Sequence, residues 1–196
     1  ISGFYHPQEG EVWYKGARRP EMKPFEVARQ GIARTFQNIA LFEGMSVLDN
    51  VMTGRLNHMK SGILSQAIWY GKAEREETEN RAVVERVIDF LEIQHIRKTP
   101  VSRLPYGLKK RVELARALAA DPKLLLLDEP MAGMGHEDID KIAALIKRVS
   151  ANRTILMVEH NLSVVAGLCD YVVVMTRGSV LAEVVVYPRL KSGAKV

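Results

Sequence analysis

One short stretch near the middle of the chain constrains the fold more than any other. Four consecutive leucines, Leu124 to Leu127, run directly into Asp128, Glu129 and Pro130. An all-apolar run of this length predicts a strand that is buried on both faces, in the middle of a parallel sheet. Pro130 ends regular pairing, and open α/β sheets bind their ligands at the carboxyl ends of their strands. The two carboxylates indicate a magnesium-nucleotide site, although a buried strand that surfaces at Asp128 would also explain one of them.

Strands and helices alternate along the rest of the sequence. Further strands are predicted for residues 10–16, 32–36, 154–159, 171–175 and 180–187, of which 154–159 is also expected to be buried. Helices are predicted for residues 24–31, 47–52, 74–91, 109–120, 137–150 and 162–168, of which 137–150 carries an apolar stripe at Ile139, Ile142, Leu145, Ile146 and Val149. Ser46 is placed to cap the second of these helices. The alternation predicts an α/β protein with a largely parallel sheet, into which a mostly helical region, residues 47–100, is inserted.

Composition narrows the class of protein further. A chain of 196 residues can bury one sizeable core, and its single cysteine, Cys169, excludes an internal disulfide framework. No apolar run approaches the length of a membrane-spanning helix. The net charge of +5 fits an anionic ligand or partner, but no Lys/Arg block marks an arm that binds nucleic acid.

Four separated motifs then follow one another in a characteristic order. They are Thr35-Phe36-Gln37, the stretch Leu104 to Leu108, the leucine strand with its two acids, and Glu159-His160. In this order they resemble the ATP-binding subunit of an ABC transporter. The segment from Gly31 to Val47 is most typical of the importers for branched-chain amino acids and related solutes.

The resemblance implies a P-loop NTPase-type sheet with an inserted helical subdomain. Residues 1–46 would be the remainder of the N-terminal sheet region together with the glutamine loop. Residues 47–108 would form the helical subdomain with the signature motif. Residues 109–196 would form the core that carries the Walker B strand, the D-loop and the histidine loop.

The resemblance also assigns roles at an ATP and Mg²⁺ site. Asp128 corresponds to the carboxylate that holds Mg²⁺, largely through water, since Mg²⁺ keeps several waters and needs few carboxylates. Glu129 corresponds to the residue that orients or deprotonates the attacking water. His160 corresponds to the histidine that contacts the γ-phosphate and that water. Gln37 corresponds to the glutamine that reaches the magnesium or the water.

The signature motif departs from the family pattern Leu-Ser-Gly-Gly-Gln. Pro105 replaces the serine and Leu108 the glutamine, so contact with a phosphate of the opposite subunit falls to the backbone at Tyr106 and Gly107. Gly135 stands where the family usually has Asp or Asn in the loop that crosses the dimer interface, so that polar contact is in question. The basic residues that follow the signature, 109–111, are predicted to form a solvated helix face, with long-range attraction of phosphate as the alternative.

The chain contains no G-x-x-x-x-G-K-[ST] phosphate loop. Ile1-Ser2-Gly3 resembles the last turn of a helix with a glycine cap, so we expect a fragment that lacks the upstream loop and is inactive in isolation. The parent protein would be an ATPase that works with a second, identical or sister, ATP-binding subunit and with membrane permease subunits. It would act at the cytoplasmic face of the inner membrane, and a periplasmic solute-binding protein would take part indirectly.

Two other classes of protein compete with this interpretation. The first is a catalytically inactive ABC fragment that serves only as an interaction module. The second is an ABC protein that works on nucleic acid or the ribosome. The lack of a second cassette, of a coiled coil and of a basic arm argues against the second alternative.

Overall fold

A computed structural model of the chain describes residues 1–3, 7–19, 23–36, 39–59 and 72–186. Its centre is a three-stranded parallel sheet in the order β3-β4-β5, formed by β3 (Ile32–Arg34), β4 (Leu124–Asp128) and β5 (Thr154–Val158). Leu124 lies opposite Ile32 on one side and Thr154 on the other. The leucine strand is therefore the middle strand of a parallel sheet, as predicted.

The prediction that this strand is buried on both faces was wrong. Its burial alternates: Leu125 and Leu127 are 0% and 2% exposed, whereas Leu124 and Leu126 are only partly buried. The same holds for β5, where Leu156 is 48% exposed. The cause is an unequal covering, because the main core packs on one face of the sheet and a much smaller apolar cluster packs on the other.

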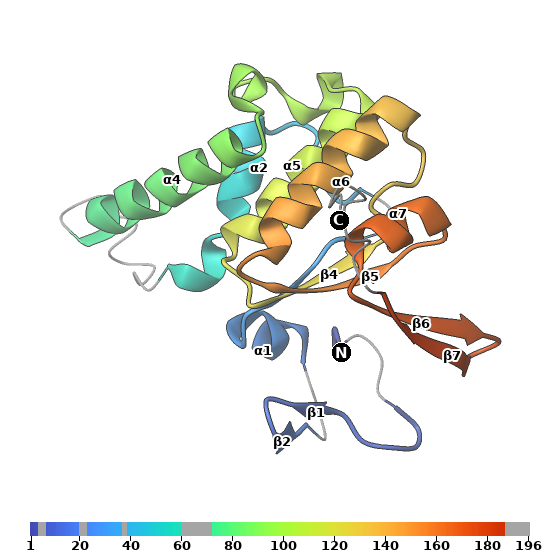
Figure 1. The fold of residues 1–196 in the computed structure, drawn as a ribbon. Coiled ribbons are helices and arrows are strands. Elements are labelled where there is room, and N and C mark those ends of the chain that lie inside the picture. Colours follow the sequence, from blue (N-terminus) through green and yellow to red (C-terminus); the bar gives the residue numbers. More distant parts are fainter. Residues whose placement is uncertain (4–6, 20–22, 37–38, 60–71, 187–196) are drawn as a thin grey trace, which may run out of the picture.

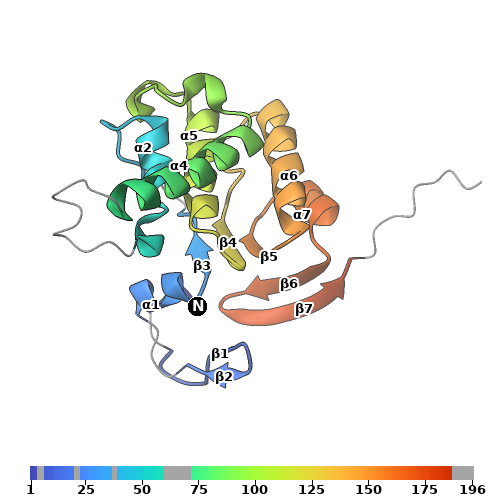
Figure 2. The same cartoon turned by 90° about the vertical axis from the view of Figure 1, so that its left-hand side faces the viewer.

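Figures 1 and 2 show the helices arranged on the two sides of this sheet. The longer helices lie on one side and α1 lies on the other, together with a short hairpin. The described helices are α1 (Pro24–Arg29), α2 (Val47–Thr53), α4 (Lys72–Phe90), α5 (Tyr106–Ala119), α6 (His136–Ser150) and α7 (Leu162–Leu168). Three short 3₁₀ turns are η1 (Leu56–His58), η2 (Gln94–Ile96) and η3 (Val101–Arg103).

The main core follows the apolar stripes of these helices. The stripe predicted on α6 packs inward at Ile142, Leu145, Ile146 and Val149, each at most 6% exposed. Burying a side chain of this size contributes roughly 1.5–3 kcal/mol relative to leaving it in water. Ser46 caps α2 as predicted, because its Oγ accepts a hydrogen bond of 3.1 Å from the backbone N–H of Asp49.

Two antiparallel hairpins accompany the parallel sheet. One consists of β1 (Trp13–Tyr14) and β2 (Ala17–Arg18), and the other of β6 (Tyr171–Thr176) and β7 (Ser179–Val185). Lys15 and Gly16 turn the first hairpin with φ of 52° and 73°. Such paired positive angles match the twist of a two-residue hairpin turn. Strand β1 was predicted from the sequence, whereas β2 was not.

The first residues of the chain differ from the predicted last turn of a helix. Residues 1–3 do not form a helical turn, although Gly3 has the positive φ, 77°, that a capping glycine adopts.

Within the described residues, no helix combines the length and the apolar character that crossing a membrane requires.

Candidate active site

Asp128 is the last residue of β4, and it forms an ion pair across the sheet. Its Oδ2 accepts a hydrogen bond of 2.9 Å from the Arg34 guanidinium at the end of β3, and the two side chains are 28% and 32% exposed. Arg34 also donates to the hydroxyl of Ser2 at 3.1 Å. The sequence analysis missed this cation, although both residues end neighbouring strands of the predicted sheet. The pair holds one carboxylate oxygen in place at the sheet edge.

Glu129 turns the chain sharply after β4. Its φ is 44°, a left-handed conformation that costs a residue with a side chain roughly 1–2 kcal/mol. Its backbone N–H donates to the carbonyl of Val158 at 3.0 Å, which ties the turn to β5. The turn brings the Glu129 Oε1 to 4.0 Å from Nδ1 of His160, a separation longer than a hydrogen bond. The His160 side chain is 74% exposed, so the imidazole faces solvent.

A buried carboxylate, Glu159, holds the two loops of this site together. Its side chain is 1% exposed and accepts backbone N–H hydrogen bonds from Met131 at 3.1 Å, His160 at 3.0 Å and Asn161 at 3.2 Å. Met131 follows the turn after β4, whereas the other two residues follow β5. Glu159 therefore fixes the relative positions of Glu129 and His160. From the sequence, Glu159 was noted only as the residue before His160, and no role was predicted for it. An acid directly after a strand that enters the core requires a hydrogen-bonding partner.

Tyr106 and Gly107 lie at another part of the surface, at the start of α5. This helix begins three residues earlier than predicted, at Tyr106, so Gly107 does stand in its first turn. A Cβ atom on Gly133 would lie 3.2 Å from the Tyr106 ring, and one on Gly107 would lie 3.0 Å from the carboxylate of Asp138. The signature residues thus pack beside the loop before α6 and the first turn of that helix. Gln37 lies outside the described residues.

The basic residues after the signature do not form a solvated face, contrary to the prediction. Lys110 is 5% exposed and its Nζ lies 3.7 Å from the carboxylate of Glu113, which is 2% exposed. The other oxygen of Glu113 accepts the backbone N–H of Phe36 at 3.0 Å. Burial raises the pKa of Glu113, while this hydrogen bond and the charge of Lys110 oppose the rise. The prediction failed because this side of α5 packs toward the end of β3.

The donor set at the sheet edge fits a magnesium ion that is shared with phosphate and water. Asp128 and Glu129 offer carboxylate oxygens, which Mg²⁺ prefers, and Asp128 is accessible enough to receive an ion. No group of three or more His, Cys, Asp or Glu side chains in the described part of the chain is arranged to hold a metal ion alone. The protein side chains described would therefore supply only part of a coordination shell.

Comparison with known proteins gives one consistent result. The family model for ABC transporters matches residues 1–132. The branched-chain amino acid transport ATP-binding protein LivG of Escherichia coli K12 is 31% identical over 189 residues, which is 93% of this chain and 72% of that protein. A probable LivG protein of Archaeoglobus fulgidus is 33% identical over 190 residues, or 93% of this chain and 70% of that protein.

Solved structures agree with the sequence matches. A nucleotide-free ATP-binding cassette of an ABC transporter has a TM-score of 0.77 and 29% identity, and covers 95% of this chain and 74% of that one. A cassette in its ADP conformation has a TM-score of 0.78 with 29% identity, and the match covers 93% of this chain and 72% of that one. The predicted α/β cassette fold is thereby confirmed, and the parallel sheet with acids at its carboxyl edge belongs to it. The chain is a member of the ABC transporter family.

Proposed function

We propose that this chain is the ATP-binding subunit of an ABC importer for branched-chain amino acids or related solutes. One observation carries the proposal: Asp128, Glu129 and His160 converge at the carboxyl edge of β4 and β5. The relatives named for branched-chain amino acid transport support the choice of solute class.

The proposed roles follow from this placement. Asp128, held by Arg34, would keep a carboxylate oxygen directed at the water shell of Mg²⁺. Glu129 would orient the attacking water, and His160, fixed through Glu159, would reach the same water or the terminal phosphate. Bound Mg²⁺ would supply neutralisation of the charge on the phosphate oxygens. Gln37 would act as a further ligand to the metal or the water.

The signature motif is proposed to act on a second subunit. Tyr106 and Gly107 open α5, and the free N–H groups of a helix amino end can bind a phosphate. These residues pack beside the loop before α6 and the first turn of that helix, and from there they would complete the site of a partner cassette. The chain would then work as a dimer with an identical or a sister subunit, attached through permease subunits to the cytoplasmic face of the membrane.

The division into subdomains remains a proposal as well. Residues 47–108 would form the helical subdomain, flanked by residues 1–46 and 109–196. Helices α2 and α4 pack against each other and against α5, which spans the proposed boundary at residue 108.

Uptake of labelled leucine by cells tests the proposed function. Deleting the gene should abolish high-affinity uptake, and the wild-type gene should restore it. Glu129→Gln should restore less than about one hundredth of the rate, since it removes the group that positions the water. Glu137→Gln is the matched control, because this glutamate is 85% exposed and lies on the outer side of α6. Unchanged leucine uptake after the deletion would refute the proposal.

The second candidate is an interaction module that binds the dimer or the permease without hydrolysing ATP. This candidate arises because residues 1–196 contain no G-x-x-x-x-G-K-[ST] motif. The same assay separates the two: if the deletion abolishes uptake but Glu129→Gln restores it fully, the chain contributes contacts rather than catalysis. Absence of ATP turnover by the purified 196-residue chain is expected of both candidates, so the uptake assay is the measurement that separates them.

A further inference from the structure

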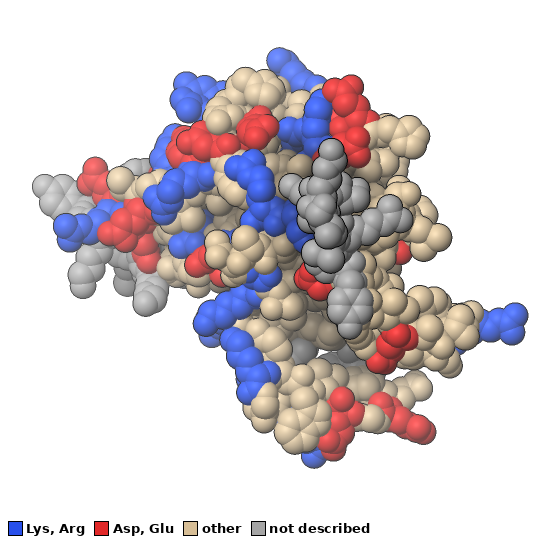
Figure 3. Space-filling model, in the orientation of Figure 1, with Lys and Arg blue, Asp and Glu red and all other residues tan. Residues whose placement is uncertain are grey.

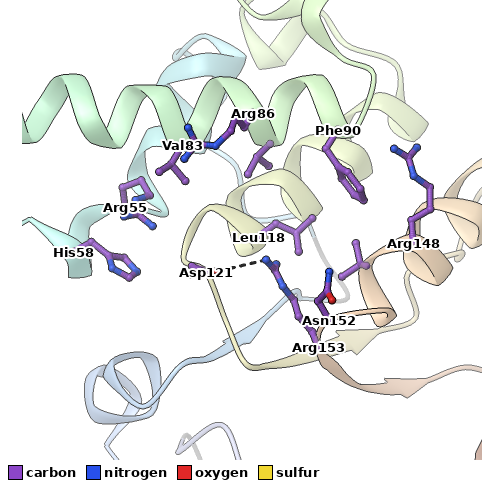
Figure 4. Close-up of a pocket in the computed structure, with 12 residues that line it drawn as sticks. Arg55, His58, Val83, Arg86, Phe90, Leu118, Asp121, Arg148, Asn152 and Arg153 are labelled. Carbon is purple, nitrogen blue, oxygen red and sulfur yellow. Dashed lines mark hydrogen bonds and ion pairs between the residues drawn. The ribbon is translucent and has the colours of Figure 1, made fainter.

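A cavity lies far from Asp128, at the amino ends of β4 and β5. It has a volume of about 410 Å³ and opens between α4, the end of α5 and the end of α6 (Figure 4). Its walls include Asp121 and Arg153, which precede β4 and β5, whereas the candidate active site follows these strands. A strand of five residues separates the two ends by roughly 15 Å. The cavity is therefore distinct from the candidate nucleotide site.

The cavity combines an apolar wall with an excess of positive charge. Val83, Val87, Phe90, Leu118 and Val149 form the apolar part. Four arginines, a histidine, an asparagine and one carboxylate line the rest: Arg55, Arg86, Arg148, Arg153, His58, Asn152 and Asp121. Figure 3 shows Lys and Arg side chains along the face on which α4 and α6 lie, with acidic residues between them. A cavity of this size, with an apolar wall facing several charged groups, matches a small organic ligand that has an apolar part and a charged part.

Two of the arginines are already paired with carboxylates. Arg153 contacts the carboxylate of Asp121 at 3.3 Å, the interaction drawn in Figure 4. Arg148 contacts Glu92 at 3.3 Å and stacks at 4.4 Å over the ring of Phe90. These pairs hold the two guanidinium groups in place at one end of the cavity.

Among the described residues, the other two arginines form no ion pair, although the charge of Asp121 acts on Arg55. Arg55 donates to the side-chain oxygen of Asn80 and to the carbonyl of Ala119, each at 2.8 Å, and both acceptors are uncharged. Arg86 is exposed and forms no ion pair with a residue in the described part of the chain. Burial lowers the pKa of Arg55, Asp121 raises it, and the charge of Arg86 lowers it. The two like charges therefore face one cavity and repel each other when no anion is bound.

We propose that this cavity binds an organic phosphate whose charged group is held by Arg55 and Arg86 and whose apolar part packs on Val87, Phe90 and Leu118. A phosphate monoester carries close to two negative charges at neutral pH, which matches two guanidinium groups that form no ion pair within the described residues. Each guanidinium presents parallel N–H donors that fit phosphate oxygens. The same chemistry is offered by a soluble phosphate ester and by the headgroup of phosphatidic acid.

The test uses 1-naphthyl phosphate and titration calorimetry on the 196-residue chain. This probe should bind at least about tenfold more tightly than inorganic phosphate, which lacks the apolar body, and than 1-naphthol, which lacks the charge. Arg86→Ala should weaken binding of the probe about tenfold or more. The matched control, Arg81→Ala, removes an exposed arginine of the same helix that lies outside the cavity and should leave affinity unchanged. Asp128→Asn should also leave it unchanged, which separates this cavity from the candidate nucleotide site.

Vesicles distinguish the two sources of phosphate. Phosphatidylcholine vesicles with phosphatidic acid should recruit the wild-type chain and not Arg86→Ala if the ligand is a lipid headgroup. Binding of 1-naphthyl phosphate without recruitment to vesicles identifies a soluble ester. The proposal is overturned if the probe binds no better than 1-naphthol, or if Arg86→Ala and Arg81→Ala weaken binding equally.

Discussion

The buried pair of Lys110 and Glu113 gives the sharpest prediction about stability. Both side chains are at most 5% exposed, and Glu113 also holds the backbone N–H of Phe36. Lys110→Met keeps the length of the side chain but removes the cation that contacts the carboxylate, and leaves Arg116 as a positive charge that also acts on Glu113. Removing one partner of a buried pair costs about 3–5 kcal/mol, because the remaining charge has lost its contacting partner in a medium of low polarity. At about 2–4 °C per kcal/mol for a chain of this size, the melting temperature should fall by roughly 6–20 °C at pH 7.

The pH dependence of this variant follows from the pKa of Glu113. Burial raises that pKa in the folded state, so the folded chain binds a proton more readily than the unfolded chain does. The stability that protonation of Glu113 contributes is therefore fully present at low pH. It is lost as the pH rises through the pKa that Glu113 has in the folded state. Lys110→Met raises the pKa further. The loss of stability should accordingly shrink as the pH is lowered from 7 toward the ordinary value of 4.5.

Two further variants make the test decisive. Lys110→Met combined with Glu113→Gln removes the buried charge and retains an acceptor for Phe36, so the free energy of unfolding should return to within about 1–2 kcal/mol of wild type. Lys109→Met is the matched control, because its partner Glu43 is 68% exposed and such a pair contributes at most about 1 kcal/mol. Urea denaturation at pH 7 and pH 5 measures all four chains. Equal losses for Lys110→Met and Lys109→Met would refute the reasoning.

Three more predictions concern stability and can be measured by urea denaturation. Leu125→Ala should cost about 2–5 kcal/mol, since Leu125 is 0% exposed, whereas Leu156→Ala at a 48% exposed site of β5 should cost less than about 1 kcal/mol. Gly133→Ala should cost about 1–2 kcal/mol, because φ is 74° and the new Cβ would lie 3.2 Å from the Tyr106 ring. Asn50→Ala should cost about 1–3 kcal/mol, because its buried amide holds the backbone of residue 42 at 2.8 and 2.9 Å. Equal effects of Leu125→Ala and Leu156→Ala, or neutral changes at the other two positions, would contradict these estimates.

Local signals in the sequence predicted the elements of the fold well. The apolar stripe of α6, the serine cap of α2 and the limits of α7 depend on neighbouring residues, and each was found as predicted. Burial was predicted less well, because it depends on which elements cover a strand. The leucine run reads as buried on both faces, yet only one face of β4 meets the main core.

Some residues of the candidate site were predicted from local motifs, whereas others depend on contacts between distant parts of the chain. Asp128, Glu129 and His160 were proposed from the resemblance of the ordered motifs to the family and from their place after strands. Arg34, Glu113 and Glu159 were missed because each acts on a residue whose proximity only the fold creates. Arg34 and Asp128 are 94 residues apart in sequence, and Phe36 and Glu113 are 77 apart. No local pattern in one sequence records such a pairing.

The three residues that lead to Gln37 attach to different parts of the molecule. Arg34 pairs with Asp128, Thr35 accepts the backbone N–H of that aspartate at 3.4 Å, and Phe36 donates to Glu113 of α5. The helix that carries Glu113 begins with the signature residue Tyr106. A displacement of this segment would therefore have to break a contact with the candidate metal ligand, with the signature helix, or with both. Residues 34–36 therefore contact both the candidate metal ligand Asp128 and the helix that begins with the signature residue Tyr106.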